Sequence, residues 1–189
     1  PQAVTSDPLV RDTEGDRLVD GAEYLLGTHP RATDSDSDGL QDGQEDDDRD
    51  GIRDPAETGA TLRDSDGDGL GDGLERLTLA TDALAADSDE DGIADGAEDA
   101  DGDGLRDPGE TDPLEADTDG DHVTDGEETR AVAGGASRFT LSPLDPDADG
   151  DGLVDGEEAW FYGTHANHPD EDCDGVPDGD DLNPYASDL

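Results

Sequence analysis

The stretch Asp34–Glu57 reads DSDSDGLQDGQEDDDRDGIRDPAE, and eleven of its 24 residues are carboxylates. Its only cations are Arg49 and Arg53. Two carboxylates about 4 Å apart repel each other by about 1 kcal/mol in water, and by several times more near a protein surface. A folded chain therefore needs something beyond its own side chains to neutralise this stretch, and the spacing of the acidic residues indicates what that is.

The whole chain shares this bias. Its 189 residues include 57 Asp and Glu but only 10 cations, all of them Arg, which gives a formal net charge of −47. Hydrophobic residues make up 29% and aromatic residues 3%, so composition alone predicts disorder. Nucleic acid and anionic membrane surfaces are excluded as partners because both attract basic patches. No apolar run approaches the roughly 18 residues of a membrane span, so membrane insertion is not expected.

The chain has no Met and a single cysteine, Cys173. We expect a processed product or an excised part of a longer protein, since Pro1 is not a translation start. One cysteine excludes a disulfide framework within the chain. Cys173 is therefore expected to be a free thiol, with an interchain disulfide as the alternative.

A twelve-residue pattern, D-x-D-x-D-G-x-x-D-x-x-E, accounts for most of the acidic residues. Residues 34–45 match it completely, and residues 46–57 repeat it without a gap. The successive starts lie 22, 12 and 18 residues apart and then 23, 12 and 18, which is a higher repeat of about 53 residues. Nine copies, called loops 1 to 9, begin at Asp12, Asp34, Asp46, Asp64, Asp87, Asp99, Asp117, Asp147 and Asp170.

These copies divide the chain into segments. We expect an N-terminal extension at 1–11, loops 1 to 7 at 12–128, an insertion at 129–146, loops 8 and 9 at 147–184, and a short tail at 185–189. The insertion could form a small hairpin around its paired glycines.

The carboxylate spacing within each copy is that of a calcium loop. Side chains at positions 1, 3 and 5 converge on one point, and position 7 offers its carbonyl. Position 9 binds directly or through water, and a Glu at position 12 closes the site with both oxygens. Magnesium prefers a smaller octahedron with retained water, and zinc prefers His or Cys, so calcium is the expected ion.

Nine such loops predict about nine calcium ions. More could bind, because nine loops with five acidic residues each use 45 of the 57 carboxylates and leave twelve. We expect metal binding and folding to be one event. The expected ligands in loops 1 to 3 are Asp12, Glu14, Asp16, Leu18, Asp20, Glu23, Asp34, Asp36, Asp38, Leu40, Asp42, Glu45, Asp46, Asp48, Asp50, Ile52, Asp54 and Glu57. Those in loops 4 to 6 are Asp64, Asp66, Asp68, Leu70, Asp72, Glu75, Asp87, Asp89, Asp91, Ile93, Asp95, Glu98, Asp99, Asp101, Asp103, Leu105, Asp107 and Glu110. Those in loops 7 to 9 are Asp117, Asp119, Asp121, Val123, Asp125, Glu128, Asp147, Asp149, Asp151, Leu153, Asp155, Glu158, Asp170, Asp172, Asp174, Val176, Asp178 and Asp181.

Four residues depart from the pattern. Arg17 and His122 replace the position-6 glycine, where the turn needs a conformation that other residues resist. Glu14 stands where Asp is usual at position 3, and Asp181 replaces the closing Glu of loop 9. The shorter arm of Asp181 predicts a weaker site in loop 9.

Two features distinguish the pattern from an EF-hand. Glu45 and Asp46 are adjacent, so no helix can separate loops 2 and 3, and position 7 is apolar in all nine copies. The pattern resembles the thrombospondin type 3 repeat, particularly its bacterial version, most closely at Thr111–Glu128 (TDPLEADTDGDHVTDGEE) and Tyr24–Glu45 (YLLGTHPRATDSDSDGLQDGQE). The last copy, Asp170–Pro184 (DEDCDGVPDGDDLNP), looks more like the animal version without its paired cysteines.

The resemblance covers about residues 12–184 and implies both a fold and a role. The implied fold is a chain wrapped around a line of calcium ions with little regular secondary structure. The implied role is an extracellular, calcium-ordered spacer or interaction module without enzymatic activity. We therefore expect an irregular, elongated, calcium-stabilised repeat array of EF-hand-like loops without paired helices.

Short helices are expected where the chain leaves a loop with room to spare, at residues 19–27, 71–80 and 154–163. The first and third segments end in glycine, which often caps a helix C-terminus. Thin apolar contacts between repeats are expected from the position-7 residues together with Leu25, Leu26, Leu74, Leu77, Trp160 and Phe161.

Other kinds of site have little support. The aspartates of the glycine-rich stretch 67–73 would repel phosphate, and a catalytic acid needs an isolated carboxylate in apolar surroundings. We expect His29 and His165 to be solvated turn residues, with transition-metal ligation as the alternative. The aromatic run 160–162 is expected to pack locally, with a sugar platform or a partner anchor as the alternative. Enzymatic activity is therefore not expected.

These features predict a non-enzymatic, calcium-binding structural protein of the bacterial cell surface or extracellular space. It could be a rigid stalk or a subunit of a surface or matrix fibre. Its expected partners are calcium, further copies of itself in end-to-end or lateral assembly, and other surface or matrix proteins. One alternative is a calcium-dependent adhesion or docking module. Another is an acidic calcium reservoir or mineral-binding protein, which the register of the repeats disfavours.

Overall fold

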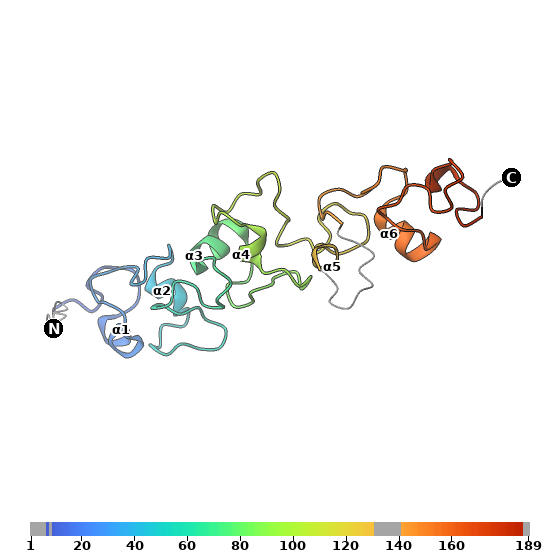
Figure 1. The fold of residues 1–189 in the computed structure, drawn as a ribbon. Coiled ribbons are helices and arrows are strands. Elements are labelled where there is room, and N and C mark those ends of the chain that lie inside the picture. The colour runs from blue at the N-terminus through green and yellow to red at the C-terminus, as the bar shows by residue number, and fades with distance from the viewer. Residues whose placement is uncertain (1–6, 8, 131–140, 187–189) are drawn as a thin grey trace. The chain divides into compact units, whose positions relative to one another are not determined.

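The computed structural model describes residue 7, residues 9–130 and residues 141–186 (Figure 1). Within these ranges the backbone forms short helices joined by turns, and no strand. The prediction of low secondary structure with a few short helices is confirmed. No helix in the described ranges has the length and apolar character that crossing a membrane requires. In chain order, the helices are α1 (Asp20–Leu26), α2 (Asp42–Glu45), α3 (Asp72–Leu74), η1 (Glu75–Leu79), α4 (Asp95–Glu98), α5 (Asp125–Thr129), α6 (Asp155–Glu157), η2 (Glu158–Tyr162) and η3 (Asp178–Asp180).

The chain divides into two compact units. Unit 1 comprises Pro1–Ser88 and Ala94–Leu105, and unit 2 comprises Asp89–Ile93 and Arg106–Leu189. Loops 1 to 4 lie in unit 1 and loops 7 to 9 lie in unit 2, whereas loops 5 and 6 contribute residues to both. The hairpin predicted within the insertion falls mainly on residues 131–140, outside the described residues.

The residue at position 10 decides whether a helix begins. Among the described residues, seven helices begin at the position-9 aspartate of a loop, and glycine follows that aspartate each time. Loops 3 and 6 carry Pro55 and Pro108 at position 10, and no helix begins there. Proline disfavours the helical conformation of the residue before it, here Asp54 and Asp107. We call loops 1, 2, 4, 5, 7, 8 and 9 the spine loops, and loops 3 and 6 the side loops.

The three helices predicted from the sequence are confirmed as α1, as α3 with η1, and as α6 with η2. They end at Gly27, Ala80 and Gly163, whose φ angles of 91°, 66° and 75° are left-handed. The glycine caps expected for the first and third helix are therefore present. In each case the N–H of the cap residue bonds to the carbonyl of the position-12 glutamate of the same loop.

Consecutive spine loops stack through the glycine at position 10. Gly43 of loop 2 lies so close to the carbonyl of Asp16 in loop 1 that a Cβ would sit 2.6 Å from the oxygen. Real Cβ atoms essentially never come this close, so only glycine fits. The same contact recurs in unit 1 between Gly73 and Asp38 and between Gly96 and Asp68, and in unit 2 between Gly126 and Asp91, Gly156 and Asp121, and Gly179 and Asp151.

The side loops pack against helices instead. A Cβ on Gly51 of loop 3 would lie 2.9 Å from the Cα of Ala22 in α1. A Cβ on Gly104 of loop 6 would lie 2.8 Å and 2.9 Å from side-chain atoms of Thr78 and Leu74. Loop 3 therefore contacts the helix that follows spine loop 1, and loop 6 contacts the helices that follow spine loop 4.

Among the position-7 residues, only those of spine loops are buried. The position-7 residues Leu18, Leu40 and Leu70 are buried, whereas Ile52 and Leu105 of the side loops are 60% and 62% exposed. Val123 and Leu153 of spine loops 7 and 8 are buried as well. The predicted apolar contacts at position 7 are therefore confirmed for these five residues and wrong for Ile52 and Leu105. The predicted contacts are also wrong for Leu25, Leu77, Trp160 and Phe161, whose side chains are exposed.

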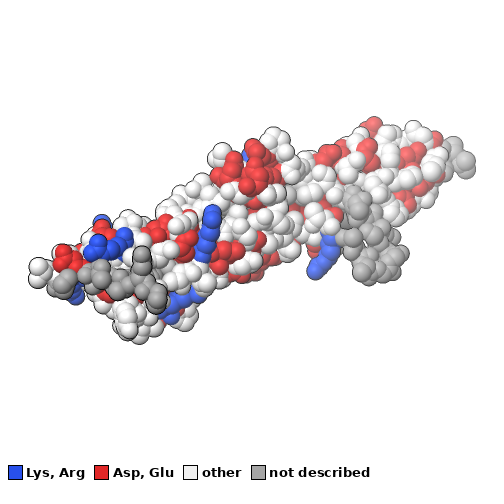
Figure 2. Space-filling model, turned by 60° about the vertical axis from the view of Figure 1, so that its left-hand side comes forward, with Lys and Arg blue, Asp and Glu red and all other residues white. Residues whose placement is uncertain are grey.

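The interior positions of the helices belong to carboxylates instead. Glu23, Glu75 and Glu158, each at position 12, are 0% exposed, and so are the position-9 aspartates Asp42 and Asp72. The face in Figure 2 accordingly shows wide areas without Asp or Glu, although 57 of the 189 residues are acidic. Burial of this many carboxylates is the property that the candidate site has to explain.

Candidate metal centres

Each loop is shaped by hydrogen bonds from its backbone to its own aspartates. In loop 4, the N–H groups of Gly67 and Gly69 donate to the two oxygens of Asp64 at 2.6 and 3.2 Å, and the N–H of Leu70 donates to Asp68 at 2.7 Å. Loops 1, 2, 7, 8 and 9 repeat the bonds from position 6 to position 1 and from position 7 to position 5. The loop backbone thereby orients the aspartates at positions 1 and 5.

The turns need left-handed backbone at positions 4 and 6. Arg17 and His122 at position 6 have φ angles of 83° and 82°, so they occupy the conformation that was expected to favour glycine. Position 4 needs it as well, which was not predicted. Ser37, Glu90 and Cys173 at this position have φ angles of 67°, 64° and 60°.

The position-9 aspartate closes each spine loop by accepting bonds from position 2. In loop 2, Ser35 donates both its N–H and its hydroxyl to Asp42 at 2.7 Å, and the same hydroxyl accepts the N–H of His29 at 2.9 Å. The N–H of position 2 donates to position 9 in every spine loop. Position 2 is Ser or Thr in loops 1, 2, 4, 5 and 7, a recurrence that the sequence shows but whose role was not predicted.

After these bonds, the spine loops retain buried carboxylate oxygens without a hydrogen-bond partner. Glu23 and Glu128 are 0% and 1% exposed, and neither oxygen of either residue has a partner. A charge buried without compensation carries a penalty of several kcal/mol. In the described part of the chain no side-loop residue contributes such an oxygen. Further oxygens of this kind at positions 3 and 12 belong to Glu14, Asp36, Glu45, Asp66, Glu75, Asp119, Asp149 and Glu158.

Burial also raises the pKa of these carboxyl groups. Loss of solvation, reinforced by neighbouring carboxylates, raises the pKa of Glu45 and Glu128 to about 9 and that of Glu23 to about 8. The same causes raise the pKa of Asp36 and Asp119 to about 6. Near pH 7 the glutamates can therefore stay buried only by holding a proton or by sharing a cation.

The predicted ligands come together in groups whose donor atoms lie within 4.8 Å of one another. The groups within one loop that are named below combine positions 1, 3 and 5, positions 3, 9 and 12, or positions 1, 3 and 12, as the calcium pattern requires. Their donors are carboxylate oxygens, which suit a hard cation. The groups within one loop include Asp12, Glu14 and Asp16; Glu14, Asp20 and Glu23; Asp34, Asp36 and Asp38; and Asp46, Asp48 and Glu57.

One group of this kind joins two loops. It combines Asp38 and Glu45 of loop 2 with Asp72, the position-9 aspartate of loop 4. The stacking contact brings Asp72 there, because the N–H of the adjacent Gly73 donates to the carboxylate of Asp38 at 3.1 Å. The sequence predicted Asp72 as a ligand of its own loop only. Equivalent bonds of 2.7–3.1 Å join Gly96 to Asp68, Gly126 to Asp91 and Gly179 to Asp151.

A threonine that follows the loop bonds to the position-12 glutamate. Thr81 donates its hydroxyl to Glu75 at 3.4 Å after the helix η1. Thr58 donates to Glu45 at the same distance, although the whole of loop 3 lies between them in the sequence. A side loop therefore occupies the place that a helix takes after other spine loops. Helices follow loops 1 and 4, whereas side loops follow loops 2 and 5, and this alternation accounts for the higher repeat of about 53 residues.

Loop 3 has the ligand pattern but closes differently. The N–H of Asp47 at position 2 donates to Glu57 at 2.9 Å instead of to the position-9 aspartate. The N–H of Asp54 at position 9 donates to the other oxygen of Glu57, also at 2.9 Å. The carboxylate-bearing residues Asp48, Asp50 and Asp54 are exposed. Glu57 thus closes the loop through the backbone.

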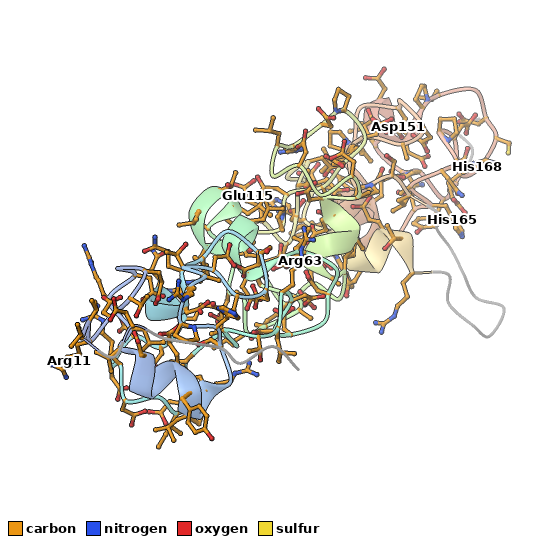
Figure 3. All side chains as sticks on the ribbon, turned by 90° about the vertical axis from the view of Figure 1, so that its left-hand side faces the viewer. Arg11, Arg63, Glu115, Asp151, His165 and His168 are labelled. Atoms are coloured by element: carbon orange, nitrogen blue, oxygen red, sulfur yellow. The ribbon has the colours of Figure 1, made fainter. Side chains whose placement is uncertain are left out.

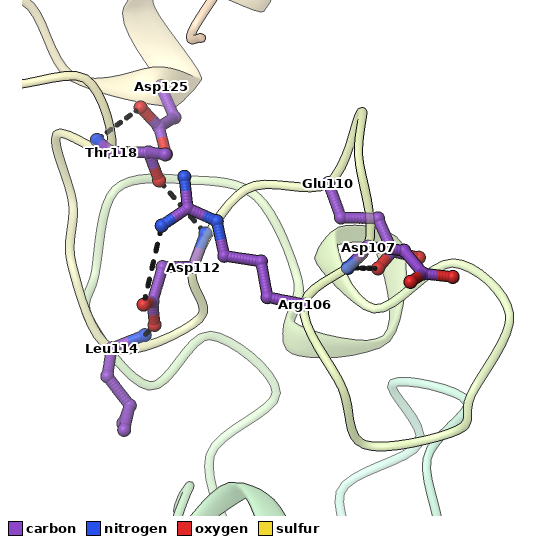
Figure 4. A network of polar contacts seen from close by, with 7 residues as sticks. All are labelled: Arg106, Asp107, Glu110, Asp112, Leu114, Thr118 and Asp125. Carbon is purple, nitrogen blue, oxygen red and sulfur yellow. Dashed lines mark hydrogen bonds and ion pairs between the residues drawn. The ribbon is translucent and has the colours of Figure 1, made fainter.

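Both kinds of closure occur in unit 2, as Figure 4 shows. In spine loop 7, the N–H of Thr118 donates to Asp125 at 2.9 Å. In side loop 6, the N–H of Asp107 donates to the position-12 glutamate, Glu110, at 2.8 Å. The bond of Asp107 corresponds to the bond of Asp54 in loop 3.

The predicted ligands of loops 5 and 6 are divided between the two units. Unit 1 holds residues 87, 88 and 94–98 of loop 5 and residues 99–105 of loop 6. Unit 2 holds residues 89–93 and 106–110. Each part has the bonds of its class, for example from Ser88 to Asp95 at 2.7 Å within unit 1.

Loop 9 departs most from the pattern. Nδ1 of His165, whose side chain is partly exposed, pairs at 2.6 Å with Glu171 at position 2, so this turn residue has a protein partner besides solvent. Figure 3 labels His165. His29 is exposed, as expected. Cys173 is exposed and makes no disulfide within the chain, so the choice between a free thiol and an interchain disulfide stays a prediction. Asp181 at position 12 keeps one buried oxygen without a partner, so it retains part of the role of the missing glutamate.

No family model, curated protein or solved structure matches this chain. The resemblance to thrombospondin type 3 repeats therefore stays a prediction, and the functional interpretation rests on the loops themselves.

Proposed function

We propose that this chain is a calcium-ordered structural protein whose spine loops fold around calcium ions. The observation that carries the proposal is the state of Glu23 and Glu128, which are fully buried with all four carboxylate oxygens lacking a partner. Other carboxylate oxygens surround each of them and raise the pKa further. A divalent cation would turn this repulsion into coordination.

The donor set favours calcium over other ions. In a spine loop, the ion would be held by the aspartates at positions 1, 3 and 5, the carbonyl of position 7 and both oxygens of the position-12 glutamate. Such a set offers at least six oxygens, which suits calcium better than the smaller magnesium ion. The ion's contribution is positive charge, and the contribution of the chain is to orient the oxygens through its turns.

The biological role follows from this architecture. Loops of the calcium type that work outside the cell bind with dissociation constants of about 0.1–1 mM, so they fill where calcium is abundant. We propose an extracellular or surface location, membership of the thrombospondin type 3 repeat family, and a non-enzymatic role as a stalk or as a subunit of a surface or matrix fibre.

The test is a calcium titration of a chelator-stripped sample, followed by circular dichroism and small-angle scattering. We expect an expanded chain to become compact and to gain helical signal as calcium is added, with magnesium at the same concentration as the control. A spectrum and scattering profile that calcium leaves unchanged would overturn the proposal. A chain that binds calcium but stays expanded would favour the acidic reservoir instead.

A calcium-dependent adhesion module is the second candidate. The exposed aromatic side chains of η2 favour it, since Trp160 and Phe161 are 66% and 81% exposed. Aromatic residues are enriched at binding hot spots. Replacement of Trp160 by Ala should then abolish binding to a surface or matrix partner while the calcium-induced change in circular dichroism remains.

A further inference from the structure

We propose that calcium-loaded copies of this chain join end to end by stacking loop 1 of one copy on loop 9 of the next. The joint uses the same contact that joins consecutive spine loops within the chain. The inference rests on the proposed function and adds to it the two surfaces that meet and the direction of assembly. The partner is a second copy of this chain.

The contact inside unit 1 defines what such a joint needs. Loop 4 stacks on loop 2 through Gly73 at position 10, which leaves no room for a Cβ beside the carbonyl of Asp38. The N–H of Gly73 also donates to the carboxylate of Asp38 at 3.1 Å. Arg63, which directly precedes loop 4, lines a cavity together with Asp38 and Gly39 of loop 2. Asp72 at position 9 is 0% exposed in this stack.

Loop 1 presents the same surface without a loop upon it. Gly21 holds position 10 of loop 1, and a Cβ there would meet no described atom within 4 Å. In each of the other six spine loops, a Cβ at position 10 would meet a carbonyl oxygen of the loop below. Asp20 at position 9 is partly exposed, whereas its six counterparts are 0–2% exposed. Among the described residues, no spine loop therefore covers this face of loop 1.

Loop 9 presents the opposite surface of the stack. In the part of the chain that the structure describes, no position-10 glycine lies against loop 9. Its closing residue, Asp181, is partly exposed. The position-12 glutamates of the other six spine loops, each of which carries a stacked loop, are 0–1% exposed. Val176 at position 7 is also partly exposed. Loop 9 of one copy thus offers the surface on which Gly21 of another copy can stack.

The charges of the two surfaces favour this pairing. Seven of the twelve residues of loop 9 are acidic and none is basic. Arg11 directly precedes loop 1, as Arg63 precedes loop 4, and its side chain is exposed. Stacking would bring Arg11 to the acidic surface of loop 9, and such complementarity favours the joint of unlike faces. Because the two faces differ, the joint is heterologous, and its repetition extends a filament.

The joint should depend on calcium. Within the chain, stacking brings a carboxylate oxygen of Asp72 within 4.8 Å of those of Asp38 and Glu45. Carboxylates this close repel each other unless a cation lies between them. The same arrangement would bring Asp20 of one copy to Asp181 of the next. Calcium therefore has to be present for the copies to join, unlike association through exposed apolar side chains.

The experiment measures the mass of the full chain by sedimentation velocity at saturating calcium, with a reductant that prevents a disulfide at Cys173. We expect the average mass to rise with chain concentration between about 10 μM and about 1 mM, and a chelator to restore the monomer. Gly21→Ala should lower the association constant at least about tenfold, because its Cβ would meet a carbonyl across the joint. Val176→Glu should do the same, because the joint would bury an added charge.

A mixture of these two variants is the matched control, because each variant keeps the face that the other has lost. The mixture should form dimers and nothing larger, as a heterologous joint requires. Trp160→Ala should assemble like the parent chain, since η2 takes no part in the joint.

The inference is overturned if the calcium-loaded chain stays monomeric up to about 1 mM, if Gly21→Ala assembles like the parent, or if Trp160→Ala alone prevents assembly. Circular dichroism of the same samples separates this result from a failure of the proposed function. A chain whose spectrum does not respond to calcium would defeat the proposed function. A chain that folds with calcium but stays monomeric would defeat only the stacking of copies.

Discussion

Loops 2 and 3 adjoin at Glu45 and Asp46 and carry the same ligand pattern, yet they fold differently. Loop 2 starts a helix, stacks on loop 1 and buries its closing glutamate at 1% exposure. Loop 3 starts no helix, stays outside the stack and bonds its closing glutamate to the backbone. The two loops differ at position 10, which is Gly43 in loop 2 and Pro55 in loop 3.

Different residues therefore determine where the metal ligands meet and whether the loops stack. Ligand positions decide where carboxylates meet. Position 10 decides whether a loop can approach the spine loop before it. Glycine at this position leaves room for the carbonyl of the position-5 aspartate of that earlier loop, whereas proline prevents the helix that brings the two together.

The largest expected effect comes from protons in the absence of calcium. The pKa of Glu45 and Glu128 is about 9 in the folded chain, against an ordinary value of 4.5. Between these values the folded state binds more protons than the unfolded state, so the free energy of unfolding falls as the pH rises through this window. We expect the chelator-treated chain to gain helical signal on acidification from about pH 8 to about pH 5. Circular dichroism checks this, and a chain that is equally unfolded at both pH values would contradict it.

The second prediction tests the stack. Gly73→Ala places a Cβ against the carbonyl of Asp38 and should lower the free energy of unfolding of the calcium-loaded chain by about 2–3 kcal/mol. Gly21→Ala is the matched control, since Gly21 holds the same position in loop 1 and a Cβ there would meet no described atom within 4 Å. It should be neutral or stabilise by up to about 1 kcal/mol. Denaturant unfolding measures both, and equal effects would remove the case for stacking.

The third prediction tests the hydroxyl at position 2. Ser65→Ala removes a bond to Asp72 at 2.6 Å and a bond from Gly59 at 2.9 Å, so it should destabilise the calcium-loaded chain by about 1–2 kcal/mol. Loop 8 has Ala148 at this position. The reverse substitution, Ala148→Ser, should be neutral or stabilising. Thermal unfolding of the calcium-loaded chain measures the effect of both substitutions. If Ser65→Ala has no effect, the hydroxyl does not contribute to loop closure.

The smallest expected effect concerns the strained turns. His122 has a φ of 82°, which glycine adopts without strain, so His122→Gly should stabilise the chain by about 1 kcal/mol. His122→Ala is the control, because it keeps the Cβ and should gain little. The melting temperatures of the two variants at saturating calcium measure this difference. Equal values would mean that the positive φ of residue 122 does not destabilise the chain.

The sequence predicted the ligand geometry well because that geometry is local. The carboxylates of Asp34, Asp36 and Asp38 meet as their spacing requires, and the helices after loops 1, 4 and 8 lie where the extra residues allowed them. The single-turn helices such as α2 were not predicted, since four residues are too few to show a periodic apolar pattern.

The stack could not be predicted in the same way because it joins residues about 30 positions apart. The approach of Gly73 to Asp38 depends on backbone shape and leaves no apolar signal. The signal that existed was the contrast between Asp-Gly and Asp-Pro at positions 9 and 10. The apolar contacts expected from Trp160 and Phe161 were wrong because the buried side of that helix is used by Glu158.

Anomalous diffraction from calcium-loaded crystals would show directly whether calcium occupies the spine loops. We expect an anomalous peak about 2.3–2.6 Å from both oxygens of Glu45, with Asp34, Asp36 and Asp38 around the same ion. Strong density for the loop in this conformation, with no peak between these carboxylates at saturating calcium, would show that protons rather than calcium neutralise the spine and would contradict the account.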